Sequence, residues 1–272
     1  MRSIILLLIL FSETSLCGFE QKETGARSGG LCNAFSALAG DAYAVFFNPA
    51  GLASVRNVGL SLSYVPARYG FPELSRGSVL ASIPTHFGSF AVGLGRYGFD
   101  LYREVHGVLT YANSIDRVDA GINLNFYSVS IQNYGSSASV GIDAGLLITI
   151  VDELRCGLVI NNINAPTIGS TSEKIPQSFT MGIAYSPSND LTLVADIYKE
   201  QRFELSQRLG IEYWLTKNFA LRTGIATEPS EYAGGIGVRL SSFQFDYAFT
   251  IHHVLGGTHA LTFTFCPGGY ND

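Results

Sequence analysis

The chain has 272 residues and a formal net charge of −5, with 14% charged, 47% hydrophobic and 12% aromatic residues. Ordinary soluble domains carry about 25% charged residues and disordered chains carry few aromatics, so this composition excludes disorder and is unusual for a soluble protein. The acidic balance offers no basic surface to nucleic acid, and we expect no nucleic-acid partner. Beyond the N-terminus no apolar run reaches the roughly 20 residues that a transmembrane helix needs, which leaves a β-rich protein.

The first 17 residues have the pattern of a secretory signal peptide, because Arg2 gives a positive start and residues 4–11 form an unbroken apolar run. The run is too short for a permanent membrane anchor, so we expect residues 1–17 to be removed by cleavage after Cys17. Lipidation of Cys17 is the alternative, because Gly18 follows it. Three further cysteines are spaced too widely to predict a disulfide framework or a metal site: Cys32, Cys156 and Cys266.

Residues 18–56 are expected to form a compact plug segment ahead of the strands. Residues 31–39 are small and alanine-rich without alternation, which predicts a short helix closed by Gly40 and Asp41. Further on, Asn48 as N-cap and Pro49 at the first helical position predict a turn with a second short helix. The larger apolar side chains of this segment would pack against a barrel wall or, alternatively, line an apolar path: Leu31, Phe35, Leu38, Phe46 and Phe47.

From residue 57 to residue 265 the dominant signal is an alternation of apolar and polar residues with period two. Residues 243–252 are the clearest case, with aromatic and aliphatic side chains on one face and polar ones on the other. Turn residues divide the region into about fourteen predicted strands: 58–65, 78–83, 89–96, 102–114, 118–129, 138–150, 154–163, 179–186, 191–199, 204–214, 219–227, 232–240, 243–252 and 258–265. An even number of antiparallel strands of this length is typical of bacterial outer-membrane barrels.

The two faces of these strands differ from those of a soluble protein. The polar face is poor in lysine and rich in Gly, Ser, Thr and Asn, whereas a soluble sandwich would carry Lys and Glu there. The apolar face is aromatic, with tyrosines near strand ends as in a membrane girdle: Tyr64, Tyr111, Tyr185 and Tyr213. We therefore predict an all-β fold, a transmembrane antiparallel β-barrel of about fourteen strands (57–266) with a short N-terminal helical plug and a C-terminal tail (267–272), in the bacterial outer membrane. A secreted sandwich or propeller is the alternative.

With the aromatic face towards lipid, the isolated charges face the lumen. These residues are Asp119, Asp143, Arg155, Asp196, Arg208, Glu212, Arg222, Arg239 and Asp246. Neighbouring strands would bring together three pairs of opposite charge, namely Asp143 with Arg155, Asp196 with Arg208, and Arg239 with Asp246. We expect them to pair across the lumen and hold the plug; the alternative is a charged lining that selects solutes.

No motif in the sequence requires an enzyme. Residues 93–98 match the dinucleotide-binding pattern G-x-G-x-x-G, but these glycines continue an alternating strand and lack the helix that the motif needs. The adjacent His252 and His253 would face opposite ways on a strand and could not share a metal. We expect no catalytic residues, no cofactor and no metal, and keep an outer-membrane lipase or protease as the alternative.

Two blocks of the sequence resemble the FadL-like outer-membrane barrels, and most of all their PorV/PorQ branch. The first covers residues 25–53, with these positions carrying the plug signature: Gly25, Arg27, Gly29, Gly30, Ala34, Asp41, Asn48, Pro49, Ala50, Gly51 and Leu52. The second covers residues 246–249 and 255–261, which are similar to the closing hairpin of that branch. The resemblance implies a fourteen-stranded barrel with an N-terminal plug, in agreement with the strand pattern.

Three functions are compatible with the sequence. The first is a PorV/PorQ-like accessory or docking factor for protein export, similar to type IX secretion, with secretion-system components or exported proteins as partners. The second is a FadL-like channel for long-chain fatty acids or other hydrophobic small molecules. The third is a structural barrel with no transport role. Outer-membrane lipid is an expected partner in all three cases. The closing-hairpin resemblance and the short loops favour the first.

Overall fold

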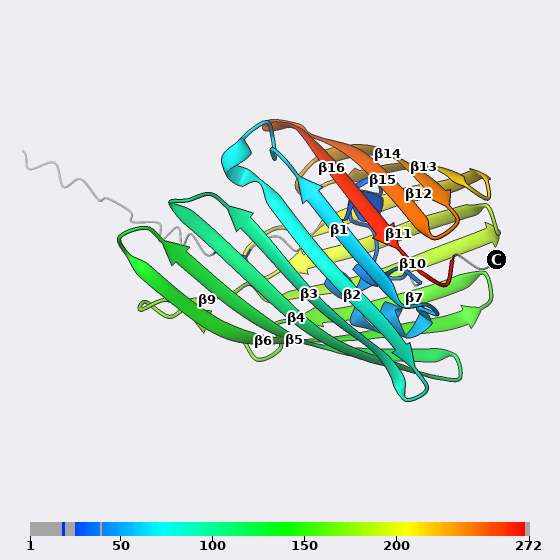
Figure 1. The fold of residues 1–272 in the computed structure, drawn as a ribbon, viewed down its shortest axis with the longest axis horizontal. Helices are drawn as coiled ribbons and strands as arrows, with labels where there is room; N and C mark the ends of the chain where they lie inside the picture. Colours follow the sequence, from blue (N-terminus) through cyan, green and yellow to red (C-terminus); the bar gives the residue numbers. More distant parts are fainter. Residues whose placement is uncertain (1–17, 20–24, 39, 270–272) are drawn as a thin grey trace, which may run out of the picture.

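The structure, a computed structural model, describes residues 18–19, 25–38 and 40–269. Fourteen antiparallel strands form a closed sheet. It closes where β1 (Gly59–Val65) lies beside β16 (Gly256–Phe265), as Figure 1 shows. The predicted signal peptide and Cys17 lie outside the described residues. In the described part of the chain, no helix is long and apolar enough to cross a membrane.

All fourteen predicted strands overlap a strand of the barrel. In chain order the barrel strands are β1 (Gly59–Val65), β2 (Arg76–Thr85), β3 (Gly88–Gly98), β4 (Tyr102–Ile115), β5 (Val118–Ile131), β6 (Gly135–Val151), β7 (Leu154–Asn161), β10 (Ser178–Ser188), β11 (Leu191–Glu200), β12 (Ser206–Thr216), β13 (Phe219–Ala226), β14 (Glu231–Leu240), β15 (Phe243–His252) and β16 (Gly256–Phe265). The connection from β7 to β10 carries a small hairpin of β8 (Thr167–Ile168) and β9 (Glu173–Lys174), and the β1–β2 loop carries the 3-10 helix η3 (Pro72–Leu74). The sequence did not reveal the hairpin because two-residue strands are too short for a periodic pattern.

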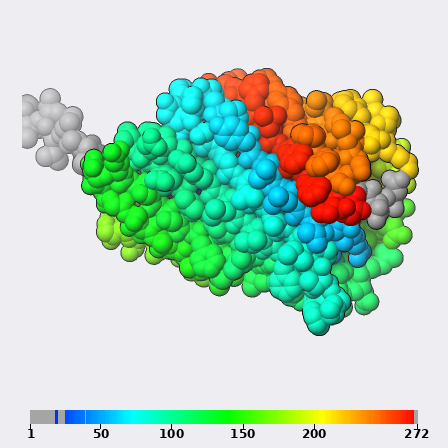
Figure 2. Space-filling model, in the orientation of Figure 1, coloured from blue at the N-terminus to red at the C-terminus, as the bar shows by residue number. Residues whose placement is uncertain are grey.

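The barrel is polar inside and apolar outside. On β1 the side chains of Ser61 and Ser63 are 0% and 7% exposed, whereas Leu62 and Tyr64 are 46% and 52% exposed. Closure leaves no free strand edge, as Figure 2 illustrates where β1 (cyan) meets β16 (red). A closed antiparallel barrel with an apolar exterior satisfies its backbone in lipid and is the architecture of bacterial outer-membrane proteins, so the chain belongs in that membrane.

The two ends of the barrel differ. At one end, the turn end, neighbouring strands are joined by two-residue turns such as 86–87 and 116–117, while the other end, the loop end, carries the longer connections 66–75 and 162–177. The loop end is oblique, because β6 begins at residue 135 but pairs with β7 only from Ala144 onwards (Figure 1). Outer-membrane barrels have short periplasmic turns and longer external loops, so we assign the loop end to the outside.

The N-terminal segment lies inside the lumen. Its helical turns are α1 (Ala26–Gly29), η1 (Ala42–Phe46) and η2 (Pro49–Ser54), with α1 against β14, β15 and β16, and η2 against β3 to β6. The side chains of Leu31 and Phe35 are fully buried in a cluster that includes Leu147 of the barrel wall. Leu31 and Phe35 therefore pack against the barrel wall, which is one of the two alternatives predicted for the apolar plug residues.

The helix predicted for residues 31–39 is wrong for the part of it that the structure describes. Cys32 and Asn33 have positive φ angles of 48° and 60°, through which a right-handed helix cannot continue. The carboxylate of Asp196 on β11 then accepts hydrogen bonds from the backbone N–H groups of Phe35 and Ser36, both at 2.9 Å. Side chains of the barrel thus take the role that helical carbonyls would have had.

Two further plug positions show where local signals succeed and fail. Asp41 does not close a helix but begins one, because its carboxylate accepts the N–H of Tyr43 at 2.8 Å and caps η1. The prediction at Asn48 is confirmed, since its side chain accepts the N–H of Ala50 at 3.1 Å and Pro49 follows at the first position of η2.

Candidate functional site

Glycines of the wall let the plug backbone approach the strands. An added Cβ on any of three inward-facing glycines would overlap the backbone of the plug. The pairs are Gly121 with Pro49, Gly157 with Ser36, and Gly224 with Leu31. These glycines lie on β5, β7 and β13, no two of which are adjacent, so the plug is held close to the wall at several points around the lumen.

A chain of charged side chains joins the plug to one side of the wall. Arg27 of α1 contacts Glu212 of β12 through two hydrogen bonds, Nε–Oε2 at 2.8 Å and Nη2–Oε1 at 2.6 Å, and contacts Asp41 through Nη1 at 3.1 Å. Burial acts to lower the pKa of Arg27, but the charges of Glu212 and Asp41 outweigh it and raise the pKa above its ordinary value. The guanidinium is therefore permanently charged.

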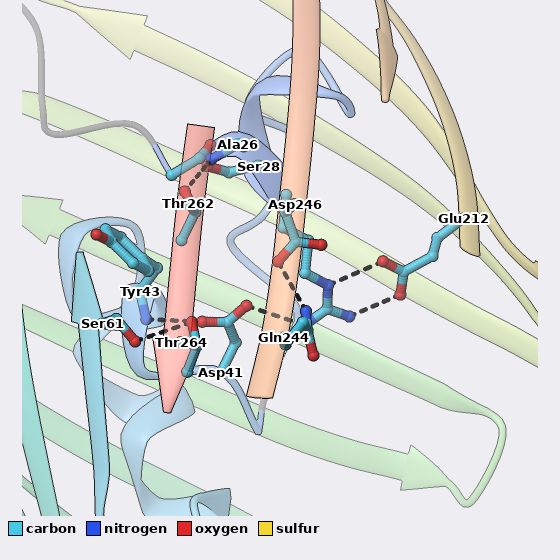
Figure 3. Close-up of polar contacts among 12 residues, drawn as sticks. Ala26, Ser28, Asp41, Tyr43, Ser61, Glu212, Gln244, Asp246, Thr262 and Thr264 are labelled. Atoms are coloured by element: carbon cyan, nitrogen blue, oxygen red, sulfur yellow. Dashed lines mark hydrogen bonds and ion pairs between the residues drawn. The ribbon is translucent and has the colours of Figure 1, made fainter. Parts of the chain in front are cut away.

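The chain continues into the wall through a second arginine. Arg222 of β13, whose side chain is 0% exposed, donates from Nε to Glu212 at 2.6 Å and from Nη1 to Asp246 at 2.7 Å. Gln244 then links Asp246 (2.8 Å) to Arg239 (3.2 Å). Figure 3 shows the carboxylates of Asp41, Glu212 and Asp246 converging on this cluster from the plug, β12 and β15. We call Asp41, Arg27, Glu212, Arg222, Asp246, Gln244 and Arg239 the plug network; its three cations balance its three anions.

Asp196 forms a separate attachment of the plug. Besides the two backbone N–H groups, its carboxylate accepts the hydroxyl of Ser36 at 2.8 Å. The predicted neighbour Arg208 lies directly opposite Asp196 on β12, and its guanidinium stacks 4.2 Å from the ring centre of Tyr198. The two residues are cross-strand neighbours as predicted, but the hydrogen bonds of the carboxylate go to the plug.

Two of the three predicted charge pairs are wrong in detail. Asp143 lies opposite Asn123, and its carboxylate accepts from the Asn123 amide at 3.2 Å and the Asn162 N–H at 2.8 Å, whereas Arg155 lies opposite Thr149. Arg239 lies opposite Gln244 and reaches Asp246 only through it. The reason is register, since a shift by an even number of residues keeps the face of a strand and changes the partner. Thr149, the partner of Arg155, is six residues from Asp143, and Gln244, the partner of Arg239, is two residues from Asp246.

The remaining predicted site residues lie outside the plug network. Asp119 accepts a hydrogen bond from Ser54 of η2 at 3.3 Å. Arg155 is half-buried on the face of β7 that also carries the inward Gly157. In the plug signature, Gly30 packs closely against Gly235 of β14, and five further positions are buried: Ala34, Pro49, Ala50, Gly51 and Leu52. Gly25 is the N-cap residue of α1, and Gly29 is its last residue.

A cavity of about 490 Å³ lies between the plug and the loop end. Its lining includes Phe46 and Phe47 of the plug, Tyr198 and Arg208 of the wall, and Arg68 of the β1–β2 loop. It combines aromatic surface with charged groups. A smaller cavity of about 40 Å³ adjoins it, because Phe46 and Tyr198 line both.

The alternation predicts Arg208 as a lumen-facing charge, and Tyr198 stands on the inward face of a predicted strand in the same way. Arg68 could not be predicted, because it comes from a loop that the alternation does not describe. Cys32 also lines the cavity, and burial raises the pKa of its thiol to about 12. It is therefore a protonated, unreactive thiol at neutral pH. Among the described residues, no group of three or more His, Cys, Asp or Glu side chains could hold a metal ion.

Solved structures share this fold over almost the whole chain. The monoaromatic hydrocarbon channel CymD superposes with a TM-score of 0.64 at 14% identity, over 89% of this chain and 97% of CymD. The toluene transporter TodX of Pseudomonas putida gives 0.66 at 12% identity, over 90% and 97% of the two chains. A FadL homologue of Pseudomonas aeruginosa gives 0.62 at 12% identity, over 92% and 100%. No protein-family profile and no curated protein matches the sequence.

The chain is therefore a plugged outer-membrane β-barrel with the fold of the FadL-type channels. At these identities the similarity establishes the fold. The predicted closeness to the PorV/PorQ branch stays a prediction, because these structural neighbours do not test it.

Proposed function

We propose that the protein is an outer-membrane channel that admits a hydrophobic or amphipathic small molecule from the loop end and binds it above the plug. The observation that carries the proposal is the cavity of about 490 Å³ between the plug and the loop end, a size suited to small-molecule ligands. The fold supports it, because two similar structures are named as channels or transporters of monoaromatic hydrocarbons or toluene.

The lining gives the ligand its expected character. Phe46 and Phe47 provide an apolar floor, while Arg208 and Tyr198 place polar groups on the wall. Such a site suits a molecule with an apolar body and a polar group, because buried charged groups need a partner when they lose water. The plug segment 18–56 and the barrel 57–266 would then act as gate and wall, and passage would need a local rearrangement of the plug.

An accessory role in protein export was the first expectation from the sequence, but it has no specific support among the described residues or in the comparisons. A purely structural barrel leaves the cavity without a role. The channel is therefore the function that we put forward, with fatty acids and other hydrophobic small molecules as its candidate substrates.

Uptake by intact cells tests this proposal. Bacteria that lack their own hydrophobic-molecule channel would express the protein and receive a radiolabelled long-chain fatty acid or naphthalene. We expect faster uptake with the wild type, and loss of that gain in Ala226→Trp, whose side chain would fill the cavity that Ala226 lines. The matched control is Ala195→Trp on β11, where the side chain points out of the barrel. Equal uptake with and without the protein would overturn the proposal.

A further inference from the structure

The N-terminal end of the plug segment is hydrogen-bonded to a buried carboxylate at the loop end. Glu104 of β4 is 7% exposed. Its Oε2 accepts the backbone N–H of Phe19 at 3.1 Å, and its Oε1 accepts the hydroxyl of Tyr102 at 2.6 Å. The aromatic ring of Phe19 packs 4.8 Å from the ring of Tyr127, in a cluster with Ile168 and Ile175.

The residue before Phe19 fits this position because it has no side chain. A Cβ added to Gly18 would lie 2.7 Å from Glu104 Oε1 and 2.7 Å from the hydroxyl oxygen of Tyr102. Since the amide nitrogen and Cβ of one residue are about 2.5 Å apart, the nitrogen of Gly18 lies within about 5 Å of this carboxylate oxygen.

We propose that the mature protein begins at Gly18 and that its new α-ammonium group pairs with Glu104. Hydrolysis of the Cys17–Gly18 peptide bond by a peptidase of exported proteins would add hydroxide to the Cys17 carbonyl carbon and a proton to the Gly18 nitrogen. An α-amino group has an ordinary pKa of about 8, so it is charged at neutral pH. An ammonium group at this distance favours the ionised form of a carboxylate.

The pairing would fix the leading end of the plug. Phe19 is held on β4 and β5, whereas the N–H of Ala26 donates to the hydroxyl of Thr262 on β16 at 2.8 Å. The two anchors lie on different sides of the lumen, and Phe19 also lines the smaller cavity. Processing at Gly18 would thus add an ion pair to the attachment of the plug at the loop end. This role does not depend on which molecule the channel carries.

Intact mass and N-terminal labelling test this proposal. Protein purified from membranes of cells that express the full chain should have the mass of residues 18–272. A mass that retains residues before Gly18, or that shows an acylated Cys17, would overturn it.

An amine-reactive reagent at neutral pH should then label the N-terminus about tenfold faster in Glu104→Gln than in the wild type, the change that loss of a partly buried charge pair would give. Gln keeps the size of the side chain and its acceptor oxygen, and heat-dependent gel mobility shows that the barrel is folded. The control is Glu73→Gln in the exposed η3 turn at the same end. Equal labelling rates in wild type and Glu104→Gln would contradict the pairing.

Discussion

Glu212 attaches the plug to the barrel wall through buried ion pairs. It lies between two arginines, Arg27 of the plug and Arg222 of the wall, and its side chain is 3% exposed. A buried carboxylate loses its hydration, and among the described residues the guanidinium groups of Arg27 and Arg222 compensate for that loss. The contact with Arg27 also orients α1. The Glu212 side chain therefore both compensates the charge of Arg222 in the wall and holds the plug in place.

Replacement of Glu212 by Gln leaves Arg27 and Arg222 without their shared anion. We expect the free energy of unfolding to fall by about 3–5 kcal/mol, the usual cost of breaking a buried ion pair. The measurement is the melting temperature in detergent. Glu153→Gln, at an exposed turn residue, makes the same chemical change outside the lumen and should leave the melting temperature unchanged. Equal values for Glu212→Gln and the wild type would show that the plug network does not stabilise the protein.

At the scale of elements, the plug is a segment whose conformation depends on the wall. Asn48 caps η2, and its amide donates to the carbonyls of Ser36 at 2.7 Å and Leu146 at 3.0 Å. It therefore ties two parts of the plug to each other and to β6.

The variant Asn48→Ala should loosen the plug within an intact barrel. Loss of the cap costs about 0.5–2 kcal/mol, and the two carbonyls lose a buried partner. We expect faster cleavage of the plug segment by a nonspecific protease at a temperature where the barrel is folded. Asn57→Ala, which removes a hydrogen bond to Gly269 next to β1, serves as the control. The control should be cut at the wild-type rate. If Asn48→Ala is also cut at that rate, the role assigned to Asn48 is wrong.

The contrast between wall and plug explains what the sequence can predict. Strands and faces follow from the local alternation, as in Phe243, Gln244 and Phe245, which are 42%, 6% and 52% exposed. Exact partners depend on register, so Asp143 could not be matched to Asn123 in advance. The plug is less predictable still, because the backbone N–H groups of Phe35 and Ser36 donate to Asp196, which is distant in the sequence.

For the whole molecule, the arrangement of polar and apolar surface is the reverse of that in a soluble protein. On the strands, apolar side chains such as Leu62 and Phe245 lie on the exterior, while serines, asparagines and the plug network lie within. This reversal places the barrel in lipid and leaves the cavity between the plug and the loop end as the proposed site of function. The channel proposal therefore depends first on the orientation of the strands.

Fluorescence quenching by brominated lipids tests that orientation most directly. The chain has one tryptophan, Trp214, which lies inside under the guanidinium of Arg239 at 4.3 Å. A second single-tryptophan protein, Leu62→Trp with Trp214→Phe, places the reporter at an exposed position of β1. In reconstituted vesicles we expect strong quenching of the tryptophan at position 62 and several-fold weaker quenching of Trp214. Quenching of Trp214 as strong as that at position 62, or a protein that stays in water and does not enter the vesicles, would contradict the account.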